Sequence, residues 1–307
     1  MSAVEIENVT KTFGATRAVS ELSLRVPAGS VYGFIGPNGS GKSTTLRMIM
    51  RIIHPDSGTI AVLGASATSG EADSDRIGYL PEERGLYRKM LVGELLQFFA
   101  ALKGCKVGKA EIRQWLKRMD LADWEKKKVE TLSKGMSQKV QFIATVLHRP
   151  DLIILDEPFS GLDPVNMDVL KDAILELKNQ GATVLFSTHD MVVAEKMCDF
   201  VFMIFRGQKV LDGTLETIKA KYGVDTLRVR TEGNGVVFSD IAGVERVNDF
   251  GRFQELRLKK GVDPQRVLGE LTNRARISLF EIAQPSLHDI FVRIAGPEAG
   301  EVSDEPR

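Results

Sequence analysis

The chain has few features that would tie it to an oxidising compartment or to nucleic acid. Its 307 residues include only two cysteines, Cys105 and Cys198, which are far apart and lack the spacing of metal ligands. They fit a reducing cytosol, where we expect them to pack as ordinary side chains. Lysine plus arginine and aspartate plus glutamate both total 41, so the net charge is zero. Nothing in this balance favours binding to nucleic acid through bulk charge.

Long hydrophobic runs are also missing. The longest, Phe200 to Phe205, is far too short to span a bilayer. The start of the chain, Met1 to Glu5, has no basic region followed by an apolar stretch, so no secretory signal is visible. Hydrophobic residues make up 43% and charged residues 27%, which is typical of a soluble globular protein. We expect a cytoplasmic protein, and the length predicts about two domains.

One glycine-rich stretch, Gly36 to Ser43, carries the strongest functional signal. It reads G-P-N-G-S-G-K-S, follows an apolar run from Val31 to Ile35 and opens a helical pattern. Strand, glycine loop and helix are the context that a G-x-x-x-x-G-K-[ST] phosphate loop requires. The glycines let backbone N–H groups surround phosphate oxygens, and the helix directs the positive end of its dipole at the same anion. The alternative is a glycine turn that only closes a strand.

The expected ligand of this loop is ATP with magnesium. Lys42 would reach the β- and γ-phosphates, and Ser43 would bind Mg²⁺. The loop alone also fits kinases, GTPases and helicases. The nucleotide-binding residues assigned to this segment are Gly36, Pro37, Asn38, Gly39, Ser40, Gly41, Lys42, Ser43 and Thr44.

The order of elements predicts a parallel α/β sheet. Alternating or continuous apolar patterns indicate strands, and apolar residues at helical spacing indicate helices between them. Such a sheet binds ligands at the carboxyl ends of its strands. Strands are expected at Val4 to Val9, Leu22 to Val26, Val31 to Ile35, Thr59 to Leu63, Leu152 to Leu155 and Thr183 to Phe186, with helices from Lys42 to about Ile53 and over Leu91 to about Lys128.

A change in composition near Tyr222 indicates a second domain. Beyond it, alternating strands at Leu227/Val229, Leu256/Leu258 and Ile277/Leu279 accompany helical patterns over Pro264 to Leu271 and Leu287 to Ile294. We therefore expect one domain over residues 1–222 and a small α+β domain over 223–295. Residues 296–307 are rich in Gly, Pro and Glu and are expected to be disordered.

Two further segments could complete a nucleotide site. Asp156 and Glu157 end an apolar strand, where Asp156 would hold Mg²⁺ and Glu157 could act as a general base on the attacking water. Adjacent acids at a strand end can also be solvated loop residues. Ser133 and the Gly135 N–H group stand at a helix N-terminus, which can bind an anion or serve as a simple N-cap.

In combination, these segments resemble the ATP-binding-cassette (ABC) ATPases over about Val4 to Tyr222. Leu132-Ser133-Lys134-Gly135-Met136 is similar to the signature motif L-S-G-G-Q, and Ser160-Gly161-Leu162-Asp163 to the D-loop. His189 matches the switch histidine, and Phe13 the aromatic residue that stacks on adenine. Taken singly, His189 could be structural and Phe13 a core residue.

The resemblance implies the architecture: a P-loop ABC ATPase domain, with a RecA-like core, an antiparallel β subdomain and a helical subdomain, plus the small C-terminal α+β domain.

The sequence also departs from the usual family motifs at several positions. Lys134 and Met136 replace a glycine and the glutamine of the signature motif, while Ser133 and Gly135, the family's phosphate contacts, are retained. Glu82 stands where many relatives carry a metal-binding glutamine, so it joins Ser43 and Asp156 as a candidate metal ligand. A carboxylate, unlike an amide, donates no hydrogen bond.

The resemblance also implies a mechanism. Two cassettes pack head to tail as a homodimer, with ATP between the phosphate loop of one and the signature motif of the other, and hydrolysis reopens the pair. The segment Gly78 to Tyr87 and the C-terminal domain are similar to exporter ATPases of the sodium-extrusion and drug-resistance type. We expect an ATPase subunit, peripheral on the inner face of the cell membrane, that powers a separate ABC-2-type permease. The helices over Leu91 to Lys128 and the Glu82 loop are its candidate docking surface, although these helices could simply form a subdomain that covers its own core.

Two other functions are alternatives to an exporter ATPase. A soluble cassette protein acting on ribosomes or DNA would usually carry two cassettes or a coiled coil, and this chain has one phosphate loop, no heptad run and no net positive charge. A regulatory cassette without hydrolysis is disfavoured by intact Lys42, Asp156, Glu157 and His189.

The cargo does not follow from the sequence: sodium, a drug, a lipid and a polysaccharide are all open. The C-terminal domain is expected to contribute to homodimer contacts.

Overall fold

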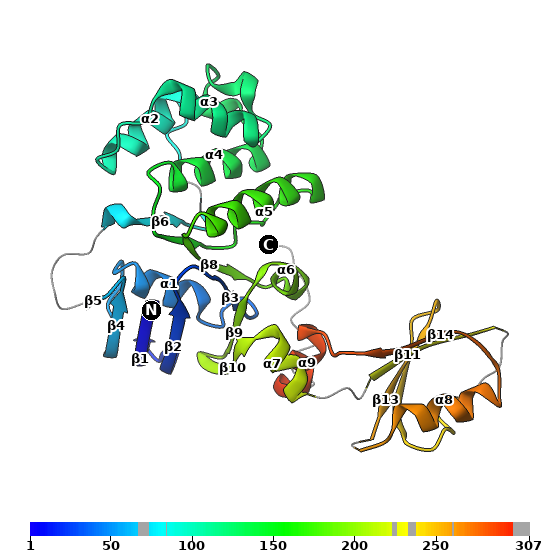
Figure 1. Ribbon diagram of the computed structural model, residues 1–307. Coiled ribbons are helices and arrows are strands. Elements are labelled where there is room, and N and C mark those ends of the chain that lie inside the picture. Colours follow the sequence, from blue (N-terminus) through cyan, green and yellow to red (C-terminus); the bar gives the residue numbers. More distant parts are fainter. Residues whose placement is uncertain (67–73, 84, 223–225, 233–237, 260, 297–307) are drawn as a thin grey trace. The chain divides into compact units, whose positions relative to one another are not determined.

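The computed structural model describes residues 1–66, 74–83, 85–222, 226–232, 238–259 and 261–296 (Figure 1). The chain divides into two compact units, Met1–Leu215 and Glu216–Arg307. The division falls after the first residue of helix α7 (Leu215–Lys221), whereas the sequence predicts the domain boundary after this helix. The sequence predicts a disordered tail over residues 296–307, and residues 297–307 of it lie outside the described residues.

The first unit contains an antiparallel sheet in the order β2-β1-β4-β5. Its long strands β1 (Ser2–Phe13) and β2 (Thr16–Pro27) form a hairpin, and β4 (Ser57–Val62) pairs with the other edge of β1, followed by the short β5 (Ala65–Ser66). Alternate side chains such as Val4, Ile6 and Leu24 are buried, and they join one core with residues of the larger sheet.

The second sheet of this unit has the order β10-β9-β3-β8-β7-β6 and is parallel except at β10. Every residue of β3 (Val31–Ile35), β7 (Leu152–Leu155) and β8 (Thr183–Thr188) is buried, as expected of central parallel strands covered on both faces. The outer strands are β6 (Ile77–Leu80), β9 (Phe200–Phe205) and β10 (Gln208–Thr214).

Helices flank this sheet. Helix α1 (Lys42–Ile49) follows β3, α5 (Pro164–Asn179) follows β7, and α6 (Met191–Met197) follows β8. Helices α2 (Val92–Leu102), α3 (Lys109–Arg118) and α4 (Lys134–Val146) lie together at one end of the first unit (Figure 1). They correspond to the helical subdomain that the resemblance implied.

The second unit is a four-stranded antiparallel sheet with helices. Its strand order is β12-β13-β11-β14, formed by β11 (Thr226–Glu232), β12 (Val244–Asp249), β13 (Gln254–Leu258) and β14 (Arg276–Ala283). Leu227, Leu256 and Val267 belong to one core between this sheet and α8 (Pro264–Thr272). Helix α9 (Leu287–Ala295) starts with a capping box of Ser286 and Asp289. The α/β fold class with a small α+β unit is confirmed.

Several boundaries differ from the sequence prediction. Helix α1 ends at Ile49 instead of near Ile53, because Arg51 adopts a left-handed conformation with φ of 55°, which no α-helix continues. Strands β6, β9, β10 and β12 were not predicted. In the sequence, β9 is recognisable only as an apolar run. It is not predicted as a strand, because periodicity alone does not separate a short buried strand from a buried helix segment.

The contact between β6 and α4 gives a test of packing in the first unit. A Cβ atom at Gly78 would come within 2.5 Å of the Thr145 carbonyl oxygen, a backbone atom that cannot turn away. Gly78→Ala should therefore lower the free energy of unfolding by about 1–3 kcal/mol, measured by urea denaturation. Gly108→Ala, where an added Cβ meets no atom within 4 Å, is the matched control. Equal midpoints for the two variants would contradict this packing.

Candidate functional site

The glycine loop connects β3 to α1 at the carboxyl end of the parallel sheet. Gly41, immediately before α1, has φ of 110°, and an added Cβ atom there would lie 2.5 Å from the Ala18 carbonyl oxygen. At Gly36 an added Cβ atom would lie 2.2 Å from the Ile204 carbonyl oxygen. Glycine is therefore required at both positions for the loop to fit between β2 and β9.

Lys42 is folded into the loop that precedes it. Its side chain is only 6% exposed, and its ammonium group donates hydrogen bonds to the carbonyl oxygens of Gly36 at 2.7 Å and Pro37 at 3.2 Å. The Glu157 carboxylate lies 3.6 Å away. Burial lowers the pKa of Lys42, and the nearby carboxylates of Glu157, Asp156 and Glu82 oppose that shift. The ammonium group is thus held in place by acceptors that a phosphate could replace.

Asp156 directly follows β7 and is fully buried. Its Oδ1 accepts hydrogen bonds from the hydroxyl groups of Ser43 at 3.2 Å and Ser187 at 2.6 Å. Its Oδ2 is buried and has no hydrogen-bond partner among the described residues. A buried carboxylate oxygen without a partner is costly, so an additional cation or donor is expected there.

These oxygens fit a hard cation such as Mg²⁺. Mg²⁺ takes one or two protein oxygens and completes its octahedron with water and phosphate oxygens. The Ser43 hydroxyl and the Asp156 carboxylate supply such a pair, and Glu82 lines the same cavity as Ser43. Within the described ranges, no three His, Cys, Asp or Glu residues form a metal-binding group.

Glu157 has an unusual backbone and a specific environment. Its φ is 49°, in the left-handed region that few non-glycine residues adopt. Its backbone N–H donates to the Ser187 hydroxyl at 2.9 Å, so Ser187 contacts both acids. The His189 Nδ1 atom lies 3.2 and 3.1 Å from the two carboxylate oxygens, and an ionised carboxylate requires that this nitrogen donates. Burial raises the pKa of Glu157, while His189 and Lys42 lower it.

The phosphate loop and the acids enclose a cavity of about 260 Å³. It is lined by Ala18, Asn38, Gly39, Gly41, Lys42, Ser43, Thr44, Glu82 and Glu157. Asp156 adjoins it through Ser43, and His189 through Glu157. Gly36 and Pro37 contribute carbonyl oxygens to Lys42, and Ser40 is buried behind the loop. The positively charged Lys42 and the glycine loop suit a polyphosphate, and the Glu157 carboxylate lies beside them.

Beyond the residues that adjoin this cavity, three further predicted residues do not line it. Phe13, at the end of β1, is 50% exposed, and the Lys11 ammonium stands 5.5 Å from its ring centre. An exposed ring can stack on a base. Ser133 is the N-cap of α4 and accepts a hydrogen bond from the Met136 N–H at 3.2 Å, and Gly135 follows within the first turn. The signature segment thus does not contribute to the phosphate-loop cavity of its own chain.

Sequence reasoning missed two residues of the site. Ser187 orients both acids, and Ala18 lines the cavity from β2. Ser187 could have been found, because it stands near the end of a strand that neighbours the Asp156 strand in a parallel sheet. Ala18 gives no signal, because its role depends only on where the β2 backbone passes the loop.

Comparisons with known proteins agree with this geometry. The family described as "ABC transporter" matches residues 19–160, and "ATP-binding protein DrrA1-3-like, C-terminal domain" matches residues 213–295. The chain is 41% identical over 293 residues, which is 95% of this chain and 98% of its relative, to the uncharacterized ABC transporter ATP-binding protein YhaQ of Bacillus subtilis. The chain belongs to the ABC transporter ATP-binding proteins.

Two further similarities are informative. The chain is 30% identical over 315 residues, covering 99% of it and 95% of the relative, to the daunorubicin/doxorubicin resistance ATP-binding protein DrrA of Streptomyces peucetius. A solved structure described as the ATP binding subunit of an ABC transporter matches with a TM-score of 0.66 and 31% identity, over 72% of this chain and 94% of that chain.

Family membership identifies the chemistry of the cavity. ABC ATP-binding proteins are ATPases that bind nucleotide, and the alternative of a ribosome- or DNA-directed cassette finds no support among these relatives. The drugs in the name of DrrA refer to that relative and do not identify a cargo for this chain.

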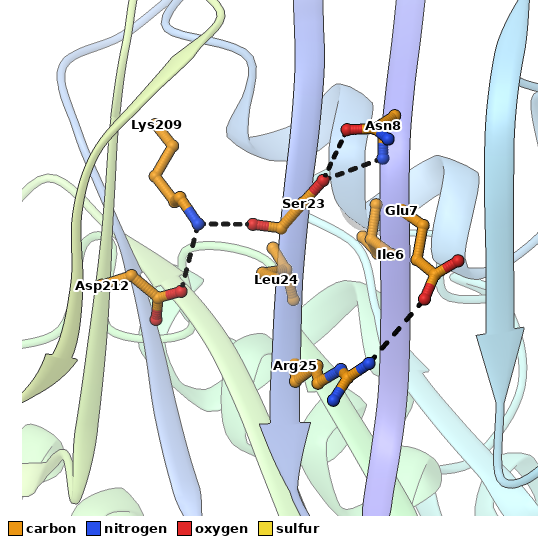
Figure 2. A pocket seen from close by; sticks show the side chains of 8 residues that line it. All are labelled: Ile6, Glu7, Asn8, Ser23, Leu24, Arg25, Lys209 and Asp212. Atoms are coloured by element: carbon orange, nitrogen blue, oxygen red, sulfur yellow. Dashed lines mark hydrogen bonds and ion pairs between the residues drawn. The ribbon is translucent and has the colours of Figure 1, made fainter.

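A larger cavity of about 480 Å³ lies away from the ABC nucleotide site, across β1, β2 and β10 (Figure 2). Its polar side chains are engaged with each other and with the backbone. Lys209 contacts the Ser23 carbonyl oxygen at 2.8 Å and Asp212 at 3.6 Å, the Ser23 hydroxyl bonds to Asn8, and Arg25 lies 3.8 Å from Glu7. These polar side chains therefore already contact one another or the backbone, and they do not indicate a ligand for this cavity.

Replacing the carboxylate of Glu157 tests its role as the base. Glu157→Gln keeps the shape of the side chain but cannot accept a proton, so ATP hydrolysis should fall by about 10²–10⁴-fold while MgATP binding persists. Phosphate release and nucleotide binding measure the two effects. The exposed Glu7→Gln on β1 is the control. If Glu157→Gln hydrolyses ATP as fast as the parent, another group is the base.

The His189–Glu157 contact predicts a shift in the pH profile. Because His189 lowers the pKa of Glu157, His189→Ala should raise it. A base works only when deprotonated, so the acid limb of the residual ATPase activity should move to higher pH. The rate should be followed from about pH 5 to about pH 9 at saturating MgATP. His54→Ala, on an exposed turn, is the control, and an unmoved limb in His189→Ala would mean that this contact does not set the pKa of the base.

Proposed function

We propose that the chain is the ATP-hydrolysing subunit of an ABC exporter and drives a separate ABC-2-type membrane permease. The observation that carries the proposal is the combination of the cassette with a DrrA-like C-terminal domain, which covers residues 213–295. The relative DrrA is named for resistance to daunorubicin and doxorubicin. The class of cargo stays open between drug, sodium, lipid and polysaccharide.

Each residue of the cavity has a role in this proposal. Lys42 leaves its carbonyl acceptors and binds the β- and γ-phosphates. Ser43 and Asp156 would hold Mg²⁺, which when bound would neutralise developing charge on the phosphates, and Glu82, which lines the same cavity as Ser43, is the further candidate metal ligand. Glu157 takes a proton from the attacking water, and His189 keeps its carboxylate oriented. Phe13 stacks on the adenine.

A second copy of the chain completes the site. Ser133 and Gly135 retain the phosphate-binding positions of the signature motif, yet they lie outside the phosphate-loop cavity of their own chain. In a head-to-tail homodimer, the N-terminus of α4 would meet the γ-phosphate held by the partner. Loss of that phosphate would then reopen the pair.

The permease would dock on the helical subdomain beside the Glu82 loop. Tyr87, Phe98 and Phe99 form an aromatic cluster with ring centres 5.5 to 6.3 Å apart, and Tyr87 is 54% exposed. Leu86, Phe99 and Leu102 line an adjoining apolar cavity of about 310 Å³. An exposed apolar patch beside such a cavity favours protein binding. None of the helices among the described residues is long and apolar enough to cross a bilayer.

The proposal is tested by isolating tagged Glu157→Gln protein from detergent-solubilised native membranes with MgATP and identifying the proteins that copurify by mass spectrometry. A polytopic ABC-2-type permease is the expected result, because hydrolysis is blocked and the ATP-bound complex persists. Peripheral attachment to the inner face of the cell membrane would then follow. Ribosomal or DNA-repair proteins without a membrane protein would contradict the transport function.

The docking surface is tested with the permease so identified. Tyr87→Ala and Phe98→Ala should each reduce copurified permease at least about tenfold, because buried interface aromatics often contribute most of the binding energy. MgATP binding by the purified variants should stay unchanged. Phe250→Ala removes an aromatic of similar exposure from the second unit and is the control. Undiminished copurification with both variants would place the docking surface elsewhere.

A further inference from the structure

The second unit contains a small polar cavity that the nucleotide chemistry does not use. Its volume is about 200 Å³, and it lies between one face of the β12-β13-β11 sheet and helix α9. Leu227 and Leu256 point into the core with α8, so the neighbouring residues of each strand face the other way. The cavity is lined by Thr226, Arg246, Asn248, Glu255, Arg257, His288, Asp289, Val292 and Arg293.

Two arginines stand directly opposite each other on this face. Arg246 of β12 pairs in register with Arg257 of β13, and both line the cavity. Like charges in such a cross-strand pair destabilise a sheet. The Arg257 Nε atom is buried and donates no hydrogen bond to a described residue; the Glu245 carboxylate lies 3.6 Å from it. This ion pair is too long for a hydrogen bond, and both side chains are well exposed, so it is weak.

The acids of the cavity are bound to other partners. Glu255 accepts a hydrogen bond from Arg228 at 3.3 Å, and Arg228 itself also lies 3.9 Å from Glu281. Asp289 is held by the capping box of α9, where its Oδ2 accepts from the Ser286 N–H at 2.9 Å. Among the described residues, neither carboxylate forms a hydrogen bond or an ion pair with Arg246 or Arg257. The facing guanidinium groups therefore lack a bridging anion from the described part of the chain.

The remaining donors surround the same space. Arg293 of α9 lies 3.4 Å from the Thr226 hydroxyl and 3.3 Å from the Tyr222 carbonyl oxygen, which fixes its guanidinium group at the cavity wall. His288, five residues before Arg293 on α9, and Arg246 are exposed and line the same cavity. A guanidinium group binds phosphate through two parallel N–H bonds, and two such groups on adjacent strands can bridge one phosphate.

We infer that this cavity is a binding site for a phosphate-bearing ligand, with one phosphate group bridging Arg246 and Arg257 and His288 at its opening. The volume fits a single phosphate group with a small substituent and falls below the usual range for larger organic ligands. The ligand is either a free phosphate monoester or the headgroup of an anionic lipid. The inference is independent of the transport function, because it uses residues of the second unit alone.

Calorimetric titration of the full chain tests this inference. The protein is first saturated with MgADP, so that the phosphate loop is filled, and inorganic phosphate or glycerol 3-phosphate is then added. The parent should bind one equivalent in the second unit. Arg257→Gln and Arg246→Gln should each weaken binding about tenfold or more, because a charge-assisted hydrogen bond is lost. Arg276→Gln, an exposed arginine of the same unit that lies 3.4 Å from Glu232, should bind as the parent does.

Thermal unfolding separates a binding site from a structural role. With MgADP present throughout, phosphate should raise the Tm of the parent clearly more than the Tm of Arg246→Gln, because a more tightly bound ligand stabilises the folded state more. Without phosphate, Arg246→Gln should unfold at the same temperature as the parent or above it, since one of two facing like charges is gone.

Vesicles distinguish the two ligand sources. Binding to phosphatidylcholine vesicles that contain phosphatidic acid, lost in Arg246→Gln, would identify a lipid headgroup, and binding of the soluble phosphates alone would identify a free monoester. The inference is overturned if the parent binds neither the soluble phosphates nor the vesicles. Equal binding by the parent, Arg246→Gln and Arg257→Gln would overturn it as well.

Discussion

The parallel pairing of β3, β8 and β7 is the constraint on which the nucleotide site depends. Ile35 lies beside Thr188, and Leu155 beside Phe186, so the three strands end at one edge of the sheet. The next residues along the chain are therefore the glycine loop, the two acids and His189. Hydrophobic burial of the strands holds this edge in register, and no functional side chain has to stabilise it.

Charges at this edge are buried together, which gives the site its chemistry. Lys42 and Glu157 are each hardly exposed and lie 3.6 Å apart, with the fully buried Asp156 next to them. Removing one of these charges would leave the others without compensation. Ser187 links the acids, while His189 holds the Glu157 carboxylate from the side of β8. In the proposed function, this arrangement would place a base, a phosphate-binding cation and a metal-binding carboxylate together before the nucleotide binds.

The sequence contained enough information for the core of this site because the motif residues directly follow their strands. The bounds of β3 and β7 were predicted from apolar runs alone. The role of Ser187 and the position of Ala18 depend on which strands become neighbours, which a one-dimensional pattern does not contain. The same holds for Arg246 and Arg257, whose opposition arises from the register of β12 against β13. The end of α1 was missed because a left-handed Arg51 has no clear sequence signal.

The central claim is that one chain holds only part of an ATP site and that the signature segment acts on a second copy. Sedimentation of the Glu157→Gln protein with and without MgATP tests it most directly. We expect a monomer without nucleotide, a dimer with MgATP, and no MgATP-dependent dimer when Ser133 is also replaced by a bulky residue, as in Ser133→Tyr. A protein that binds MgATP tightly and remains monomeric, or a dimer that is indifferent to Ser133, would contradict it.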